Sequence, residues 1–207
     1  MPDIRDSIVL SKEALKAIES VVAAPTYTFR DWSNDLLKGV RSEIRNFYRT
    51  QQRAKCAYCR NVITKSALGC HVEHIVPKSK YVDFIFTPKN LCVICPDCNE
   101  IKREKEVADK LEQAFRRTPK IYPRSGSAFL IYHPHFDNYE DHIIQVDGYY
   151  IDRSDKGANT IKMCTLNRRI REFGYEPSLV SSPGKLELMY KILNSGKINE
   201  ILALIED

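Results

Sequence analysis

Three short stretches decide the fold: Cys56-Ala-Tyr-Cys59, Cys70-His-Val-Glu-His-Ile-Val-Pro-Lys-Ser-Lys80 and Cys95-Pro-Asp-Cys98-Asn-Glu-Ile-Lys102. A C-x-x-C pair presents two sulfurs from one tight bend, and two such pairs complete the tetrahedral site of structural zinc. Six of the seven cysteines lie in this window, which in a reducing compartment favours a metal over disulfides. The spacing therefore predicts a closed, structural zinc site made by Cys56, Cys59, Cys95 and Cys98.

Cys92 offers a competing pair, because Cys92-Val-Ile-Cys95 has the same spacing as Cys95-Pro-Asp-Cys98. We favour the second pair, since Pro-Asp is typical of a turn whereas Val-Ile is typical of an extended strand. Free buried thiols and a redox pair are the other interpretations. Neither C-x-x-C lies in the βαβ context of redox proteins, so metal binding is the leading hypothesis.

The composition is that of a soluble globular protein of one or two domains. The 207 residues are 43% apolar and 29% charged, and the mean hydropathy is −0.39. No stretch approaches the roughly 18 apolar residues that a membrane span needs. The start MPDIRDSIVL lacks the basic and hydrophobic parts of a signal peptide, so we expect a cytoplasmic protein without a membrane partner.

Hydrophobic spacing and turn residues predict an α+β protein. Helices are expected at residues 11–22 (with Ser11 as N-cap), 30–52, 97–117, 157–173 and 185–206. Strands are expected at 69–76, 128–133 and 143–152, the last broken by a turn at Asp147-Gly148. The buried stripe of the second helix should contain Trp32, Leu36, Leu37, Val40, Ile44 and Phe47, and that of the third Leu111 and Phe115. These elements suggest a helical N-terminal region (1–52), a cysteine-rich core (53–118) and a C-terminal α+β region (119–207) packed on that core.

Positive charge is concentrated just before the cysteines. The net charge is +5 and the isoelectric point about 8.8, and residues 38–65 hold eight basic side chains against the single acid Glu43. A run of this kind is either a solvated helix face or a ridge that follows a phosphate backbone. Because it leads directly into the cysteine cluster, we favour nucleic acid. The ridge comprises four arginines spaced four apart: Arg41, Arg45, Arg49 and Arg53.

The residues between the cysteine pairs have the chemistry of phosphodiester hydrolysis. Glu73 and Asn99 supply the oxygen ligands that a hard divalent cation prefers. His74 can take a proton from water near neutral pH. A base beside a metal ligand places the activated water next to a metal-bound phosphate, which is the geometry that this hydrolysis requires.

These residues resemble the HNH endonucleases, whose fold is the ββα-metal (His-Me finger) unit. The resemblance runs from Cys56 to Lys102 and consists of C-x-x-C, E-H-I-x-P-K-S, N-L and C-x-x-C-N-x-x-K. It implies a general base at His74, a Mg²⁺ or Mn²⁺ ion on Glu73 and Asn99, and a middle asparagine, Asn90, that holds the His74 segment. It also implies DNA as the substrate, with RNA as an alternative. Phosphate contacts are expected from Lys78, Lys80 and Lys102.

Two positions depart from the commonest form of the family. Glu73 stands where aspartate is more frequent, so its longer arm moves the metal by about one C–C bond, roughly 1.5 Å. Asn99 stands where histidine is frequent. His71 lies two residues before Glu73 and shares its strand face, so it is either a third metal ligand or a strand histidine bonded to backbone. Glu73 and His74 are adjacent, so both can act only if the strand bends there, which Pro77 favours.

The remaining histidines lie further along the chain. We expect His133, His135 and His142 to be partly exposed turn and strand-end residues, rather than a second metal cluster, because no tight ligand pair accompanies them. Cys164 should be a core residue. The stretch from His133 to Arg169 resembles, more loosely, bacterial HNH proteins that work with a partner ATPase in anti-phage systems of the Septu and retron kind. An inactive zinc-knuckle module that only binds nucleic acid, and a docking subunit, are the alternatives to a nuclease.

Overall fold

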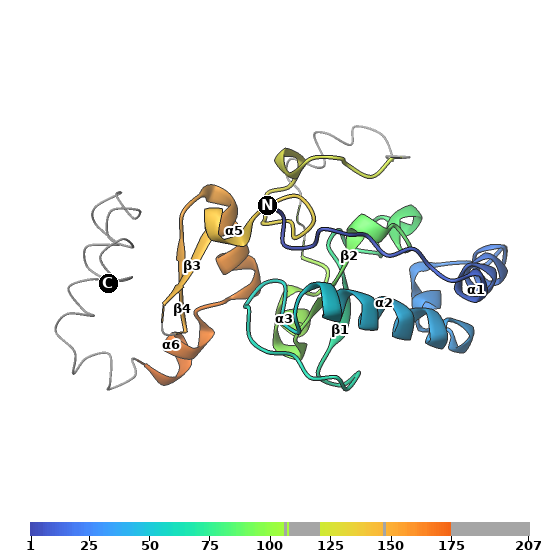
Figure 1. Cartoon of the computed structure of the whole chain (residues 1–207), viewed down its shortest axis with the longest axis horizontal. Helices are drawn as coiled ribbons and strands as arrows, with labels where there is room; N and C mark the ends of the chain where they lie inside the picture. The colour runs from blue at the N-terminus through green and yellow to red at the C-terminus, as the bar shows by residue number, and fades with distance from the viewer. Residues whose placement is uncertain (106, 108–120, 147, 175–207) are drawn as a thin grey trace. The chain divides into compact units, whose positions relative to one another are not determined.

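The computed structural model describes residues 1–105, 107, 121–146 and 148–174 of the chain. It divides by its contacts into Met1–Asn167 and Arg168–Asp207. The elements, labelled as in Figure 1, are α1 (Lys12–Val22), α2 (Lys38–Gln51), β1 (His71–His74), β2 (Leu91–Ile94), α3 (Pro96–Lys102), β3 (Ile143–Val146), β4 (Tyr149–Asp152), α5 (Asp155–Cys164) and α6 (Arg168–Phe173). The mixture of helices with small antiparallel sheets confirms the α+β prediction. No described helix is long and apolar enough to span a membrane.

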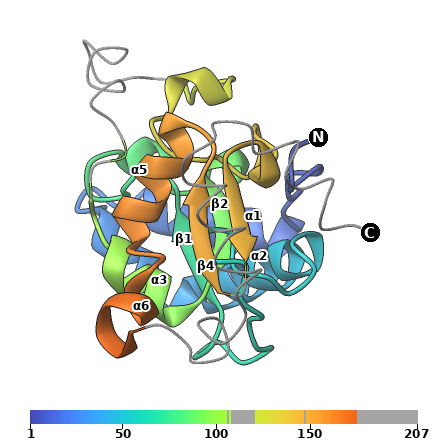
Figure 2. The same ribbon diagram turned by 90° about the vertical axis from the view of Figure 1, so that its left-hand side faces the viewer.

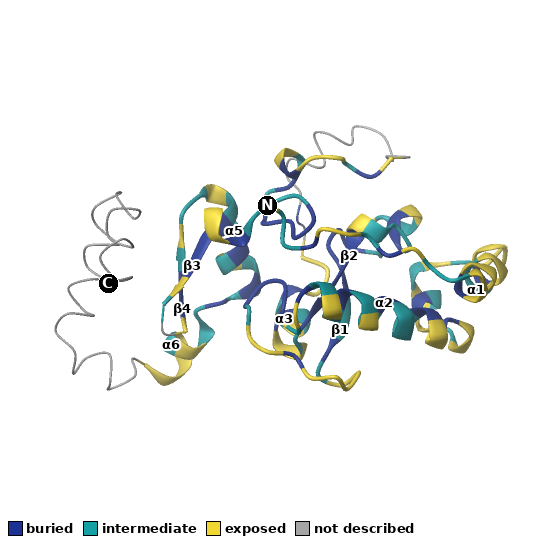
Figure 3. Ribbon diagram, viewed as in Figure 1, coloured by how far each residue is buried: buried dark blue, intermediate teal, exposed yellow. Residues whose placement is uncertain are grey.

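The centre of the first unit is a ββα arrangement of β1, β2 and α3. The two strands pair antiparallel, with His71 opposite Ile94 and His74 opposite Leu91. Every residue of β2 is buried (Figure 3). Helix α2 packs on this small sheet, and α3 contacts β1. Strand β1 thus contacts both α2 and α3, and its second half, Glu73 and His74, is buried whereas His71 and Val72 are partly exposed.

The N-terminal helices form where their caps predict, with one correction. Ser11 caps α1 by accepting a hydrogen bond from the Ala14 amide, as expected. The helix predicted at 30–52 begins only at Lys38 and follows two 3-10 turns, Phe29–Ser33 and Asp35–Leu37. Asn34 separates these turns with an extended backbone (φ −54°, ψ 140°), and its side chain caps the second. The buried stripe predicted for this helix therefore does not include Leu36, which is 63% exposed, and it does include Tyr48, which is fully buried.

Two further predicted elements differ from the structure. The helix predicted at 97–117 ends at Lys102, because Arg103 adopts φ 44° and turns the chain; Leu111 and Phe115 lie outside the described residues. The segment 128–133 was predicted to be a strand, and this prediction is wrong, although most of the segment is buried. Its backbone bonds to α5 side chains instead of a second strand: Thr160 Oγ1 accepts from the Tyr132 amide, and Asn159 donates to the Leu130 carbonyl.

The C-terminal hairpin is confirmed. Strands β3 and β4 pair from Ile143–Asp152 to Val146–Tyr149, and Gly148 has the positive φ (85°) that the tight turn requires. Helix α5 packs on β4 (Figure 2) and brings the buried Cys164 into the core, as predicted. The helix predicted at 157–173 is two helices, because Thr165 turns left-handed (φ 47°) between α5 and α6. The helix predicted at 185–206 lies outside the described residues.

Candidate nuclease site and cysteine cluster

A cavity of about 690 Å³ is lined by the residues predicted to form the active site. Strand β1 supplies His71, Glu73 and His74, and α3 supplies Asn99. The adjacent Glu73 and His74 both reach the cavity because β1 ends at His74 and the chain bends over the next two residues. The rest of the wall includes charged and aromatic side chains from several segments: Trp32, Arg41, Arg45, Lys78, Glu100, Arg103 and Glu104.

Glu73 is held by a buried lysine. Its Oε1 lies 2.5 Å from Lys102 Nζ, and Tyr58 donates a weaker bond to the same oxygen at 3.5 Å. The Lys102 side chain is fully buried, and its ammonium also donates to the carbonyls of His74 and Ile75. The prediction that Lys102 contacts phosphate is therefore wrong, because its charge is already paired inside the protein. Both of these contacts are made by Glu73 Oε1, and among the described residues no hydrogen bond reaches Oε2.

The ring of His74 is held by a hydrogen bond that fixes its tautomer. Its Nε2 lies 3.1 Å from the Ile85 carbonyl, which can only accept a hydrogen bond, so Nε2 carries the proton and Nδ1 has the lone pair. Burial, with a further contribution from the positive charge of Lys78, lowers the pKa of His74 to about 3. The ring is therefore neutral at pH 7. Trp32 packs edge-on against it, with ring centroids 4.6 Å apart.

Asn99 and His71 contact each other directly. The Asn99 amide nitrogen donates to His71 Nδ1 at 2.9 Å, so the Asn99 carbonyl oxygen takes no part in this contact. His71 thus shares the cavity with Glu73, as the strand alternation predicts, but its partner is a side chain rather than the backbone. In this arrangement the lone pair of Nδ1 is already used, so His71 orients Asn99.

Asn90 is fully buried directly before β2. Its carbonyl oxygen accepts from the Val76 amide at 2.8 Å, and its amide nitrogen donates to the Phe84 carbonyl at 3.0 Å. Its backbone carbonyl accepts from the Ile75 amide. These bonds tie β2 to the two residues that follow His74.

The four ridge arginines have different environments. Arg41 and Arg45 line the cavity, whereas Arg49 and Arg53 do not. Arg41 donates from one terminal nitrogen to the carbonyls of Trp32 and Asn34, and Arg49 donates to that of Thr64. Arg53 lies beyond the end of α2 with φ 51°, so it does not continue the helical ridge.

Arg45 differs from its neighbours in the ridge. Its Nε is buried and has no hydrogen-bond partner among the described residues. An unsatisfied guanidinium nitrogen beside a cavity can bind an anion. Lys78 lines the same cavity from the turn after β1, whereas Lys80 is exposed on that turn and is not part of the wall.

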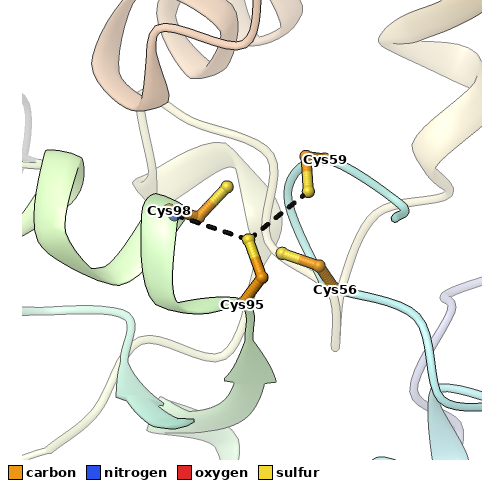
Figure 4. A group of neighbouring side chains, drawn as sticks. All are labelled: Cys56, Cys59, Cys95 and Cys98. Atoms are coloured by element: carbon orange, nitrogen blue, oxygen red, sulfur yellow. Dashed lines mark hydrogen bonds between the residues drawn. The ribbon is translucent and has the colours of Figure 1, made fainter. Parts of the chain in front are cut away.

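The four predicted cysteines form one cluster (Figure 4). Their sulfurs all lie within 4.8 Å of one another, and those of Cys59 and Cys95 are 3.6 Å apart. The separation of the Cys59 and Cys95 sulfurs is close to the sulfur–sulfur distance in a tetrahedral zinc site with Zn–S bonds of about 2.3 Å. Cys95 caps α3, and hydrogen bonds from the neighbouring thiols, Cys56 first, lower its pKa, which favours the thiolate that a metal needs. The competing Cys92 lies in β2 opposite Glu73 and is not in the cluster.

The histidines of the C-terminal region are not all partly exposed, as we had expected. His133 and His135 are 0% and 6% exposed and bond to Tyr122 and to the Leu91 carbonyl. Only His142 is partly exposed, and its Nδ1 bonds to Ser154. The correction arises because residues 129–136 pack against the core, where the His133 ring contacts the rings of both Phe129 and Phe136.

The ββα unit, the cavity lined by β1 and α3, and the four clustered cysteines together form the arrangement that the sequence resemblance implied. Residues 56–105 match the family model described as HNH endonuclease. This match confirms the resemblance of that segment, which is about a quarter of the chain. No curated protein matches the sequence.

Sequence analysis missed several residues of the cavity wall. Trp32 contacts the His74 ring from a 3-10 turn about forty residues upstream, and Glu100, Arg103 and Glu104 continue the wall beyond Asn99. The three charged residues lie two, five and six positions after Cys98, and only Glu100 is on α3, which ends at Lys102. Nothing in the motif spacing predicts the position of Trp32.

Proposed function

We propose that this protein is a metal-dependent HNH endonuclease that hydrolyses DNA phosphodiester bonds. The observation that carries the proposal is the convergence of Glu73, His74 and Asn99 on one cavity within the segment that matches the HNH model. The match supports nuclease chemistry, and the cavity supplies the base and the oxygen ligands that such chemistry requires.

Each residue has a defined task in this proposal. Glu73 Oε2 and the Asn99 carbonyl oxygen would hold Mg²⁺ or Mn²⁺, whose preference for oxygen ligands fits this donor set. When bound, the ion supplies Lewis-acid stabilisation of the charge that develops on the phosphate and the leaving 3′-oxygen. The lone pair on His74 Nδ1 accepts the proton of the attacking water, because Nε2 is already committed to Ile85. The products would carry 5′-phosphate and 3′-hydroxyl ends.

Two cationic side chains bind the substrate strand. Arg45 and Lys78 line the same cavity as Glu73, His74 and Asn99, and they would contact the scissile phosphate and its neighbour. Arg41 helps to form the wall, whereas Arg49, Arg53 and Lys80 lie outside it and would contact more distant phosphates. Such contacts provide affinity and registration without base recognition.

The cysteine cluster would hold a structural zinc. Four thiolates close the coordination sphere, so the ion contributes folding energy rather than chemistry. It joins the turn at Cys56–Cys59 to the start of α3, and Asn99 directly follows the last ligand, Cys98. Zinc would therefore fix the position of a catalytic metal ligand.

The biological setting rests on the looser resemblance alone. The stretch from His133 to Arg169 is similar to HNH subunits that act beside a partner ATPase, and on that basis we place the enzyme in a bacterial anti-phage defence system. Copurification with the product of a neighbouring ATPase gene would test this setting.

Plasmid nicking tests the enzyme directly. Wild-type protein should convert supercoiled DNA to open-circle or linear forms with Mg²⁺ or Mn²⁺, and EDTA should stop it. His74→Ala should lose this activity, whereas His142→Ala, a histidine outside the cavity, should retain it. DNA ligase should reseal nicks without end repair. Equal nicking by wild type and His74→Ala, or binding of DNA with no nicking by either, would refute the proposal and favour the binding module.

A further inference from the structure

Tyr122 and His133 form a buried chain of hydrogen bonds that ends on Asn90. The Tyr122 hydroxyl donates to Asn90 Oδ1 at 3.3 Å and lies 2.9 Å from His133 Nε2. These two residues are 32 and 43 positions after Asn90, and no part of the HNH motif includes them. We propose that Tyr122 and His133 are positioning residues of the nuclease site, which hold Asn90 and thereby the base His74. This inference rests on the proposed function.

The protons of the chain can be assigned without conflict. The His135 amide donates to His133 Nδ1 at 3.3 Å, so Nδ1 is the acceptor and Nε2 carries the hydrogen. His133 Nε2 therefore donates to the Tyr122 oxygen, whose own hydrogen goes to Asn90. Burial raises the pKa of Tyr122 and lowers that of His133, so both stay neutral and keep these roles. Each donor in this row of hydrogen bonds therefore has one acceptor.

A second contact supports the same segment. His135 Nε2 lies 2.7 Å from the Leu91 carbonyl, one residue beyond Asn90. The turn that contains both histidines is itself closed, because Asp137 accepts from the His133 amide. The turn thus bonds to Leu91 directly, through His135, and to Asn90 through Tyr122.

The route from Asn90 to the base has two branches. Asn90 Oδ1 accepts from Val76, two residues after His74, and therefore fixes the bend that turns the imidazole into the cavity. Asn90 Nδ2 donates to Phe84, whose neighbour Ile85 supplies the carbonyl that holds His74 Nε2. A shift of the Asn90 amide would move both supports of the ring together. The hydroxyl of Tyr122 restrains that shift.

The test is Tyr122→Phe, which keeps the ring and removes only the hydroxyl. Tyr132→Phe is the matched control, because Tyr132 is also buried and its hydroxyl bonds to Asp3, which takes no part in the hydrogen bonds of Tyr122, His133 and Asn90. Two readouts are needed. Hydrogen exchange of the Ile75 and Val76 amides reports on the segment without requiring activity, and steady-state nicking with Mn²⁺ separates kcat from KM.

We expect exchange at Ile75 and Val76 to rise about tenfold in Tyr122→Phe, the factor that corresponds to a weakened buried hydrogen bond. We also expect kcat to fall about tenfold with KM for DNA unchanged. Neither should change in Tyr132→Phe. His133→Leu should reproduce the loss, and His133→Gln, whose amide can donate to Tyr122, should restore most of it.

Unchanged exchange in Tyr122→Phe would overturn the chain of contacts. Faster exchange with unchanged kcat would overturn its positioning role. The exchange experiment also separates this inference from the proposed function, because a wild-type protein that cuts no DNA would refute the nuclease while the amides still report on the Tyr122 contact.

Discussion

Replacing Lys102 with methionine separates a buried positioning lysine from a phosphate-binding one. The ammonium of Lys102 lies 2.5 Å from Glu73, with exposed side-chain fractions of 0% and 8%. Removing one partner of such a pair leaves an uncompensated buried charge, which costs about 3–5 kcal/mol. Two carbonyl contacts, to His74 and Ile75, are lost as well. We therefore expect Lys102→Met to lower the free energy of unfolding by about 3–5 kcal/mol.

Urea unfolding followed by tryptophan fluorescence measures this effect. Trp32 is the single tryptophan of the chain and packs against His74, so its emission reports on the site itself. The double variant Glu73→Leu/Lys102→Met removes both charges, and it should be more stable than Lys102→Met alone because an apolar pair leaves no unpaired ion. This comparison isolates the ion pair from the general cost of changing the core.

Lys78→Met is the control, because Lys78 lines the cavity but is only partly buried. It should leave stability within about 0.5 kcal/mol of wild type. It should also reduce the slope of log affinity for DNA against log salt by about one. If Lys102→Met instead gave this result, with normal stability and a smaller salt slope, Lys102 would face a phosphate and the reasoning from its burial would be refuted.

Three other predictions concern the metal, acid and a close contact. Cys95→Ser should lose zinc and cooperative folding together, because the binding energy of a structural zinc is folding energy; a folded, zinc-free variant by elemental analysis and calorimetry would contradict this. His135 is neutral in the fold, with burial lowering its pKa from 6.5 to about 4. The unfolded chain therefore binds the extra proton, so stability is full above pH 6.5 and falls by about 3 kcal/mol as the pH drops to 4. Urea titrations at several pH values should show a smaller loss in His135→Gln. Gly157→Ala should lower the free energy of unfolding by about 1–3 kcal/mol, because the added Cβ would lie 1.8 Å from the His142 carbonyl oxygen. Gly39→Ala in α2 is the control: its Cβ would meet nothing within 4 Å, and the variant should be more stable by about 0.5–1 kcal/mol. Melting temperatures that shift in the same direction in the two alanine variants would contradict this prediction.

The parts of the molecule that sequence predicted are those with short-range causes. The C-x-x-C turns, the Ser11 cap and the Asp147-Gly148 hairpin each depend on residues within a few positions, and the cluster, cap and hairpin are present. The gathering of Glu73, His74 and Asn99 in one cavity also follows from a motif with fixed spacing. In each case the local chemistry and the fold favour the same conformation.

The errors have long-range causes. Lys102 resembles a surface lysine until Glu73, 29 residues earlier, is placed beside it. Residues 128–133 have strand composition, but α5 supplies their hydrogen-bond partners, so no second strand is needed. His133 and His135 are polar in any sequence scale, yet their partners Tyr122 and Leu91 satisfy them in the core. Burial of a polar residue depends on such partners, which spacing does not reveal.

The hydrogen bonds from the C-terminal region to the first cysteine turn affect how a docking role can be tested. Tyr139 donates to the Tyr58 carbonyl at 2.8 Å and Tyr150 to that of Cys59 at 2.5 Å, both in the interior. Truncation after residue 125 would remove both donors and leave buried carbonyls unsatisfied beside the cysteine cluster, each at a cost of about 1–3 kcal/mol. Lost partner binding in that truncated chain would therefore report unfolding. Exposed substitutions on the same region, such as Asp152→Lys, keep these bonds and test docking while DNA nicking confirms that the core is intact.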